Sequence, residues 1–336
     1  MSENSAKRGC LTVFFILLLA MSLILNGILY LTFKGKASQK SRVFHSRDFE
    51  EKTLVSSPSD NKIVVIDLFG IITYSERGES EESKIEEMIA QLKQAREDKS
   101  VKAIILRINS PGGEVNASDV LYHELRKTRD QFKKPIVAYM MSVAASGGYY
   151  AAMGSSYIVA NEMTITGSVG VIMQSLQYKN LLEKVGVKVL TFKSGKFKDM
   201  LAGNREPTQE ELDYVQSFIM ETYERFVGIV AKERKLDLNS LKTGVADGRI
   251  LSGPMALKEK FVDQLGYFED AIAKSKQLAK VDEARVVQYA MPFDWRRVFS
   301  VFGSAQAKTL EVKWSPESFV LEPGKAYFLP PHWFAN

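Results

Sequence analysis

Two alternating patterns of hydrophobic residues run through positions 62–141. Short runs rich in β-branched residues, typical of buried strands, alternate with longer segments whose apolar residues recur at helical spacing. This alternation predicts an α/β domain in which most strands pair in parallel. The strand-like runs are KIVVIDLFGII (62–72), VKAIILRI (101–108) and PIVAYMM (135–141), and the helix-like segments are 79–99 and 117–127.

The α/β pattern continues beyond the third strand. Thr208 and Glu211, placed after Pro207, form a capping-box signature that predicts a long helix ending near Arg234, and a last helix follows Gly253. Further predicted elements are strands at 157–161, 169–173 and 187–192 and a helix near 175–185.

The longest apolar run, LTVFFILLLAMSLILNGILYLTF, covers residues 11–33 without a charge. About 20 apolar residues are enough to span a bilayer as a helix, so this run predicts an uncleaved transmembrane anchor. Lys and Arg residues flank it on both sides, and the positive-inside rule leaves the orientation open. The predicted organisation is a short tail (1–10), the anchor (11–33), a polar linker (34–60), an α/β domain (61–280) and a C-terminal tail (281–336).

Composition excludes several classes of function. The net charge of +5 is modest for 336 residues and forms no basic stripe, which argues against a nucleic-acid partner. Cys10 is the only cysteine, so an internal disulfide framework and a cysteine-based zinc site are excluded.

Two glycine-bearing turns follow predicted strands. SVAASGGYY places Ser146 before Gly147, and INSPGG places Gly113 after the second strand. Parallel sheets collect their functional sites at the carboxyl ends of strands, so the N–H groups of Gly113 and Gly147 could together bind an oxyanion. Taken alone, however, Ser146 is more typical of a helix N-cap, because serine is a preferred residue at that position.

A serine nucleophile requires a base that accepts its proton. The three histidines are poorly placed, because His45 lies in the linker, His332 in the tail and His123 on an amphipathic helix with charged neighbours. Lysine is the remaining candidate. Its ordinary pKa of about 10.4 must fall by roughly three units, which burial in an apolar cleft can achieve.

Candidate bases and their supporting hydroxyls lie in two turns. The segment FKSGKFKDM carries Lys193, Lys196 and Lys198, and the turn TITGSVG offers the hydroxyls of Thr164, Thr166 and Ser168 that could orient an amine. The residues alone do not choose among them.

The ordered motifs INSPGG, SVAASGGYYAA, TGSVGV, SGKFKD and DGRILSGPMALKEKFVDQLG (247–266) resemble the bacterial signal peptide peptidases of the Ser–Lys type, within the Clp/crotonase-like superfamily. The resemblance covers about residues 60–275. It implies a Clp/crotonase-like fold of repeated ββα units behind a transmembrane helix. Clp proteases carry a histidine about 25 residues after the serine, and this chain has none near Val171, which favours the Ser–Lys branch.

Carried over residue by residue, the resemblance implies that Ser146 is the nucleophile and Lys198 the general base, with Lys196 as the fallback. It also implies that Gly113 and Gly147 form the oxyanion hole and that Ser168 orients the lysine. Such Ser–Lys pairs are an attested variant of the catalytic triad. No metal and no cofactor is implied.

The expected function is a membrane-anchored serine endopeptidase that degrades cleaved signal peptides and other apolar peptides. The resemblance also implies a ring-like homo-oligomer, with each site completed by a neighbouring subunit, and a single-pass protein of the cell membrane whose catalytic domain is extracytoplasmic. The alternatives are a Clp-like protease acting on an intact membrane-protein partner, an inactive scaffold of the same fold and, less favoured by the motifs, an acyl-CoA enzyme of the crotonase group.

The C-terminal tail is rich in aromatic residues, with KAYFLPPHWFAN at its end. Such residues are unusual in a segment that stays in solvent. The tail is therefore expected to dock onto the catalytic body, onto a neighbouring subunit or into an apolar substrate groove.

Overall fold

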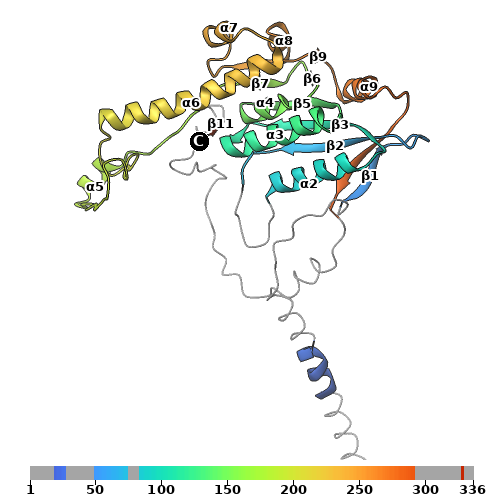
Figure 1. Ribbon diagram of the computed structural model, residues 1–336. Coiled ribbons are helices and arrows are strands. Elements are labelled where there is room, and N and C mark those ends of the chain that lie inside the picture. The colour runs from blue at the N-terminus through green and yellow to red at the C-terminus, as the bar shows by residue number, and fades with distance from the viewer. Residues whose placement is uncertain (1–18, 28–48, 75–82, 292–326, 329–336) are drawn as a thin grey trace, which may run out of the picture. The chain divides into compact units, whose positions relative to one another are not determined.

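The computed structural model describes residues 19–27, 49–74, 83–291 and 327–328 (Figure 1). Residues 19–27 are helical and belong to a first unit, 1–45, while everything else described belongs to a second unit, 46–336. Within the described ranges, no helix has the length and hydrophobicity that a membrane span requires. The anchor expected over 11–33 lies mostly outside those ranges.

The second unit is a mixed α/β domain, as the sequence predicts. Its strands are β1 (Glu50–Val55), β2 (Lys62–Phe69), β3 (Val101–Ser110), β4 (Gly113–Glu114), β5 (Ile136–Ala145), β6 (Tyr157–Ala160), β7 (Ile165–Gly167), β8 (Ile250–Ser252), β9 (Gln264–Leu265), β10 (Arg285–Ala290) and β11 (Tyr327–Phe328). Its helices are α2 (Lys84–Glu97), α3 (Val115–Asp130), α4 (Gly147–Ala152), α5 (Lys179–Lys184), α6 (Gln209–Arg234), α7 (Leu238–Thr243), α8 (Gly253–Lys258) and α9 (Phe268–Ala279).

The main sheet has the strand order β1-β10-β2-β3-β5-β6-β9, with β7 paired to β5 and β8 paired to β7. From β10 to β9 every neighbouring pair is parallel, and β5–β7 is parallel too, which confirms the expected mainly parallel pairing. The antiparallel pairs of this sheet are β1–β10 and β7–β8.

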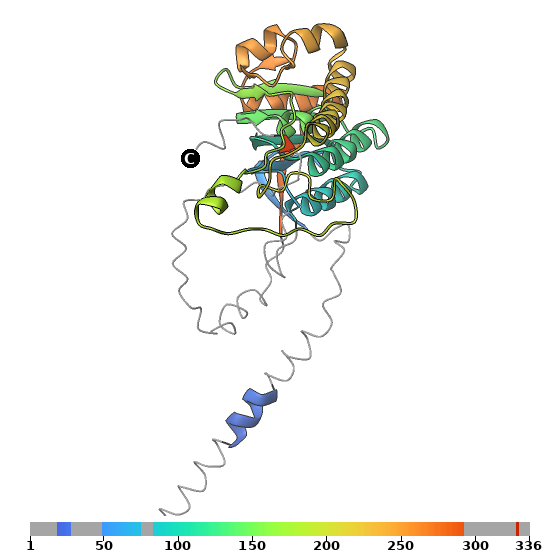
Figure 2. The ribbon, with the colours of Figure 1, turned by 90° about the vertical axis from the view of Figure 1, so that its left-hand side faces the viewer.

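Alternate residues of the central strands are buried on opposite faces of the sheet. Ile63, Ile105 and Tyr139 belong to one cluster that includes Ala271 of α9. The intervening residues, such as Ile104 and Leu106, are also fully buried. Figures 1 and 2 show α2 and α3 together on one side of the sheet and α9 on the other. Helices therefore cover both faces of the central strands.

The sheet extends past the predicted domain limits of 61 and 280. β1 lies in the segment expected as linker and β10 in the segment expected as tail, and the two strands pair with each other. β1 has the sequence EEKTLV and every residue of it is exposed, so it lacks a hydrophobic run that sequence reading could detect. α9 likewise follows the helix after Gly253 that was expected to be the last.

Two predicted strands are wrong. Residues 169–173 do not form a strand, because the strand in this region is β7 and the chain turns at its last residue, Gly167, and at Ser168, whose φ angles are 76° and 52°. Residues 187–192 are also not a strand. Their apolar side chains stay in solvent, with Leu190 79% and Phe192 88% exposed. A strand-like run becomes a strand only where a neighbouring strand pairs with it.

Candidate active site

The carboxyl ends of three neighbouring strands bring the predicted turns together. Ser110 at the end of β3 is in register with Ala144 of β5, and Ala145 is in register with Gly167 of β7. The turns that contain Gly113, Ser146 and Ser168 therefore start from adjacent strand ends. This is the edge at which open α/β sheets place their sites.

Ser146 occupies a strained turn between β5 and α4. Its φ is 51° and its ψ is −114°, a combination that non-glycine residues rarely adopt. The backbone N–H donates to the carbonyl of Gly167 at 2.8 Å, and the carbonyl accepts from the N–H of Tyr150 at 2.8 Å. The side chain has no exposed surface, and its Oγ has no hydrogen-bond partner in the part of the chain that the structure describes.

The geometry at α4 bears on the helix-cap alternative for Ser146. Ser146 is the N-cap residue of α4, but its side chain makes no capping hydrogen bond. Capping serines elsewhere in the chain do make one, as Ser252 does with the N–H of Met255. Stabilising the helix start is therefore not what this hydroxyl does.

Gly113 and Gly147 lie against each other. A Cβ on Gly147 would lie 2.5 Å from the Oγ of Ser118 and 3.1 Å from the backbone nitrogen of Gly113. A Cβ on Gly113 would lie 1.9 Å from the carbonyl oxygen of Ile72. Both positions therefore require glycine, and the two predicted oxyanion donors belong to one small region beside Ser146.

The three hydroxyls of the TITGSVG turn have different surroundings. Thr164 donates to the carbonyl of Met141 at 2.6 Å, and Thr166 donates to the carbonyl of Ala144 at 2.7 Å, so both hold the turn onto β5. Ser168 is almost fully buried, and no hydrogen bond of its hydroxyl to another described residue is found. Its hydroxyl remains available to another group.

The candidate lysines are also distinct. Lys193 pairs with Asp199 at 2.6 Å, and Lys196 pairs with Glu210 and lies over the ring of Phe197. Both amines are therefore already engaged by carboxylates of the arm. Lys198 is exposed and has no ion pair or side-chain hydrogen bond among the described residues.

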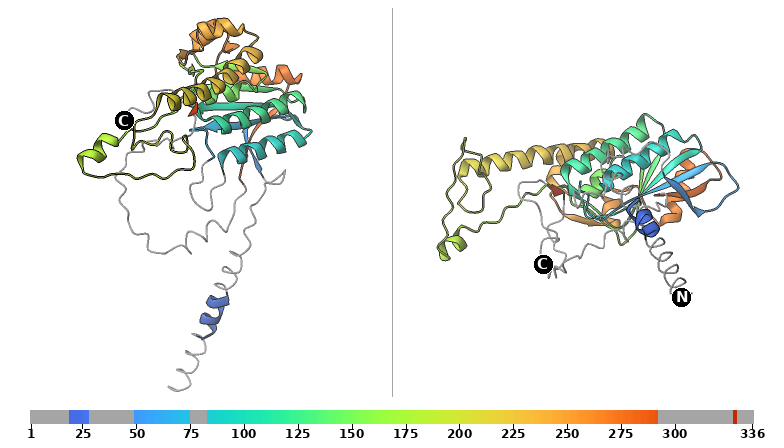
Figure 3. Two further views of the ribbon diagram at one scale, coloured as in Figure 1. Left: turned by 60° about the vertical axis from the view of Figure 1, so that its left-hand side comes forward. Right: turned by 90° about the horizontal axis from the view of Figure 1, so that it is seen from below.

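Lys198 belongs to a projection from the catalytic body, which we call the arm and define as residues 174–214. Figures 1 and 3 show α5 and the amino-terminal half of α6 extending away from the sheet. The buried apolar residues of α6 are confined to its carboxyl half, at Phe226, Val227 and Val230. Within the described part of a single copy, no hydrogen bond joins Lys198 to Ser146.

Arg205 organises the arm around the lysine segment. Its guanidinium donates to Asp199 at 2.7 Å and to Glu211 at 2.9 Å, and Glu211 also caps α6 in the predicted box with Thr208. The hydrogen bonds from Arg205 and from the Thr208 backbone lower the pKa of Glu211 to about 2. Hydrogen bonds from Arg205 and Lys193 likewise hold the pKa of Asp199 far below its usual range.

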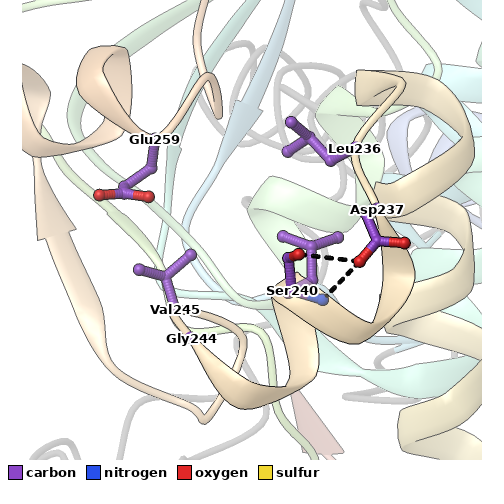
Figure 4. Close-up of a pocket in the computed structure, with 7 residues that line it drawn as sticks. Leu236, Asp237, Ser240, Gly244, Val245 and Glu259 are labelled. Atoms are coloured by element: carbon purple, nitrogen blue, oxygen red, sulfur yellow. Dashed lines mark hydrogen bonds between the residues drawn. The ribbon is translucent and has the colours of Figure 1, made fainter.

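Other sequence candidates and cavities lie elsewhere. His123 is exposed on α3, as expected of a solvated helix residue, while His45 and His332 lie outside the described residues. One cavity lies beside α7, where Asp237 accepts hydrogen bonds from the N–H and Oγ of Ser240 at 2.8 Å (Figure 4). Ser146 does not line it. Among the described residues, no cluster of acidic, histidine or cysteine side chains could hold a metal ion.

Sequence reasoning missed three features of this region. Ser118 packs against Gly147 from the first turn of α3, and its motif ASDVL carries no signal beyond helical spacing. The role of Arg205 depends on partners six residues away on either side, a spacing that no short motif describes. The third feature is β11, which pairs with β4 antiparallel.

Comparisons with known proteins match the part of the chain that contains the candidate site residues. The model of peptidase family S49 matches residues 128–282, and the Clp protease model matches residues 68–177. A protein of Enterococcus faecium predicted to be a signal peptide peptidase SppA is 39% identical over 285 residues, which cover 80% of this chain and 82% of that protein. Protease 4 of Haemophilus influenzae is 34% identical over 231 residues, covering 68% of this chain and 36% of that protein.

A plant relative extends the same similarity. The chloroplastic serine protease SPPA of Arabidopsis thaliana is 36% identical over 197 residues, covering 58% of this chain and 29% of the relative. The mixed α/β domain and the matched families agree on a protease with a Clp-like fold. The chain therefore belongs to peptidase family S49 and is a serine protease.

Proposed function

We propose that this serine protease is a membrane-anchored endopeptidase that degrades cleaved signal peptides and other apolar peptides, with Ser146 as nucleophile and Lys198 as general base. The observation that carries the proposal is the hydroxyl of Ser146, which is buried with no partner among the described residues, on a strained turn beside Gly113, Gly147 and Ser168. The apolar run 11–33 supports the anchor, and the relative named as a signal peptide peptidase supports the substrate. The resemblance supports an extracytoplasmic catalytic domain.

The proposed chemistry is acyl transfer in two steps. Ser146 Oγ attacks the carbonyl carbon of the peptide bond while the neutral amine of Lys198 accepts the hydroxyl proton. The N–H groups of Gly113 and Gly147 stabilise the negative oxygen of the tetrahedral intermediate. The protonated lysine then gives its proton to the departing amine, and water hydrolyses the acyl-enzyme by the same route.

We further propose that Lys198 reaches Ser146 from a neighbouring copy of the chain. A single copy leaves Lys198 exposed on the arm, whereas a lysine base is expected in an apolar cleft beside its nucleophile. The arm also exposes apolar side chains, among them Leu176 (85%), Leu190 (79%) and Phe192 (88%). Packing the arm of one subunit onto the body of the next would cover these residues and bury the amine, in agreement with a ring-like homo-oligomer.

Mixing two inactive variants tests both parts of the proposal. Ser146→Ala and Lys198→Ala should each lower kcat at least about 1,000-fold, while Lys196→Ala, the matched control, stays near wild type. After subunits exchange between the two inactive proteins, some sites combine an intact Ser146 with an intact Lys198, and activity should return. Full activity of Lys198→Ala alone would exclude the mechanism, and no recovery on mixing would exclude the shared site.

A Clp-like protease that acts on an intact membrane-protein partner remains the second candidate. The exposed apolar surface of the arm favours it as well, because such a surface could contact a folded partner. Comparing the cleavage rates of a released signal peptide and of full-length membrane proteins separates the two functions.

A further inference from the structure

One carboxylate joins the helix that follows Ser146 to the helix that carries the arm. The hydroxyl of Tyr150, in α4, donates to Oδ1 of Asp119, in α3, at 2.6 Å. The guanidinium of Arg225, in α6, donates to the same carboxylate, with Nη2 2.9 Å from Oδ1 and 3.0 Å from Oδ2. Asp119 therefore connects α3, α4 and α6, whose places in the fold Figure 1 shows.

The contact on α4 lies one helical turn from the nucleophile. The N–H of Tyr150 donates to the carbonyl of Ser146 at 2.8 Å. The buried ring of Tyr150 packs against Phe226 of α6 and Tyr122 of α3, with ring centroids 4.9 Å and 5.5 Å away. Burial raises the pKa of the Tyr150 hydroxyl, which therefore remains a hydrogen-bond donor. The Asp119 carboxylate is thus held by a group that is fixed relative to Ser146.

The ion pair of Asp119 with Arg225 is more exposed than the tyrosine contact. The Arg225 side chain is 61% exposed and that of Asp119 is 29% exposed. Exposed pairs usually contribute little to stability, partly because two mobile side chains must be ordered. Here Tyr150 already orders the carboxylate, and both Nε and Nη2 of the planar guanidinium donate to it. The pair therefore fixes the direction in which α6 leaves the body more than it stabilises the fold.

A small rotation of α6 at this attachment displaces the lysine segment. A helix rises about 1.5 Å per residue, so Gln209, where α6 begins, lies about 24 Å from Arg225 along the axis. A rotation of about 5° would therefore move the start of α6 by about 2 Å. Arg205 fastens the lysine segment to this start through Glu211, so Lys198 would move with it. Misplacing a reacting group by about 1 Å can lower a rate about 100-fold.

We propose that Asp119 and Arg225 are positioning residues that set the direction of α6 and thereby the place from which Lys198 acts. This inference rests on the proposed function in taking Ser146 as the nucleophile and Lys198 as the base. Loss of the ion pair should slow the chemical step and leave peptide binding unchanged, because the pair acts through α6. The buried residues of α6, Phe226, Val227 and Val230, still hold its carboxyl half on the body, so variants of the pair should fold.

The first test measures kcat and KM of single variants with a fluorogenic peptide of leucine and alanine residues. Arg225→Ala should lower kcat about tenfold and change KM less than about twofold. Arg225→Lys, which keeps the charge, should lie between this variant and wild type. Lys232→Ala is the matched control, because it removes a positive charge from the same helix and no ion pair among the described residues. An unchanged kcat of Arg225→Ala, or an equal loss in Lys232→Ala, would overturn the inference.

Asp119→Asn tests the other partner. Asparagine keeps an acceptor for the Tyr150 hydroxyl and loses the charge that attracts Arg225. Its kcat should fall as far as that of Arg225→Ala, and the double variant should lose no more than either single variant, because both remove one interaction. Multiplying losses in the double variant would show that the two residues act separately and would overturn the inference.

The second test determines which copy needs the ion pair. When Ser146→Ala and Lys198→Ala proteins exchange subunits, every restored site takes its arm from the first protein and its serine from the second. Adding Arg225→Ala to the Ser146→Ala protein should lower the recovered activity about tenfold. Adding it to the Lys198→Ala protein should change that activity less than about twofold. A general structural defect would act in both proteins, so equal losses would overturn the inference.

The two tests also separate this inference from the proposed function. If the parent mixture recovers no activity but Arg225→Ala still lowers kcat, the shared site is refuted, and the positioning role stands for an arm that acts in its own copy. If the parent mixture recovers activity and Arg225→Ala has no effect in either protein, the shared site stands and the positioning role is refuted.

Discussion

Ser146 holds a backbone conformation with φ 51° that costs about 1–3 kcal/mol for a residue with a Cβ. Two backbone hydrogen bonds, to Gly167 and from Tyr150, maintain it. In this conformation the side chain makes no hydrogen bond to the N–H groups at the start of α4. A serine whose hydroxyl has no hydrogen-bond partner in the described ranges is unusual in a buried position, because buried hydroxyls normally find a partner.

Replacing Ser146 separates strain from chemistry. Ser146→Ala keeps the Cβ and therefore the strain, whereas Ser146→Gly relieves it, so both variants should be inactive but the glycine variant should be about 1 kcal/mol more stable than the alanine variant. Urea denaturation measures the difference. Ser194, whose φ is ordinary, gives the control pair: there glycine should bring no gain over alanine. Equal stability of the two Ser146 variants would show that the backbone conformation at residue 146 is not strained.

Gly147 provides a second test at the residue scale. Gly147→Ala places a methyl group 2.5 Å from the Oγ of Ser118 and 3.1 Å from the nitrogen of Gly113. We expect a loss of stability of about 1–3 kcal/mol and a fall in kcat of at least about 100-fold. Adding Ser118→Ala removes the nearer atom and should restore much of the stability without restoring activity. Recovery of both would mean that Gly147 serves packing alone.

At the element scale, the arm is held by polar contacts. Arg205 joins Asp199 of the lysine segment to Glu211 at the start of α6. These contacts could not be predicted from the hydrophobic pattern. The described arm buries no apolar face, so its sequence shows no helical or strand periodicity that would place Arg205 near its partners. Its one clear sequence signal is the capping box of Thr208 and Glu211, and the structure confirms that box and the helix end at Arg234.

The Arg205 contacts make the arm sensitive to acid. The pKa of Glu211 is lowered to about 2, so its contribution to stability is present above the ordinary glutamate pKa of about 4.3 and is lost as the pH falls toward 2. Asp199, whose pKa is also lowered, acts in the same direction. Hydrogen exchange of residues 193–211 should therefore accelerate between pH 4 and 2 relative to the intrinsic rate.

Arg205→Ala provides the comparison for this pH effect. It removes the guanidinium, so exchange of the segment should already be fast at pH 6 and should change little on acidification. Lys179→Ala, which removes long pairs with the exposed carboxylates of Glu183 (3.9 Å) and Glu206 (4.0 Å) and no contact with Arg205, is the control and should behave as wild type. A wild-type arm whose protection does not depend on pH would contradict the role of Arg205.

The central strands could be predicted from sequence because strands buried on both faces consist of nearly continuous apolar residues. β2, β3 and β5 are long apolar runs, and their glycine-bearing turns indicated where the site would lie. β1 (EEKTLV) is exposed along its whole length and has no apolar run that would indicate a strand. The run 187–192 shows the opposite failure, because its apolar residues are real but nothing in the described chain covers them.

The arrangement of the site was less accessible to sequence reasoning than its members. Gly113 and Ser146 could be placed at the ends of strands, whereas Ser168 was expected before a strand and lies directly after β7; the structure brings the three turns together. The separation of Lys198 from Ser146 could not be read from the chain, because both segments look like ordinary strand-end loops. The pairing of β11 with β4 was equally hidden, since two residues carry no periodicity.

At the scale of the whole molecule, the exposed apolar residues of the arm predict assembly. Phe192→Asp places a charge on a side chain that is 88% exposed, so folding of the single chain should not suffer. If the arm packs onto a neighbour, the dissociation constant of the oligomer should weaken at least about tenfold, with a parallel loss of activity. Sedimentation velocity in detergent measures the assembly.

Met255→Asp is the matched control for this variant. Met255 is 50% exposed on α8, so the change is chemically the same but lies on the catalytic body. It should leave the sedimentation profile of the wild type unchanged. Unchanged assembly of the Phe192→Asp protein would mean that the arm is not the interface.

The pairing of β1 with β10 has a mechanical consequence. Glu50, the first residue of β1, lies directly opposite Ala290, the last residue of β10, so the chain enters β1 and leaves β10 at the same corner of the main sheet. Tension applied through the two flanking segments would load the ladder one residue pair at a time, as in opening a zipper, rather than shearing all its hydrogen bonds together. Pulling should thus peel β1 from the sheet at low force, while the parallel strands that carry Ser146 remain intact.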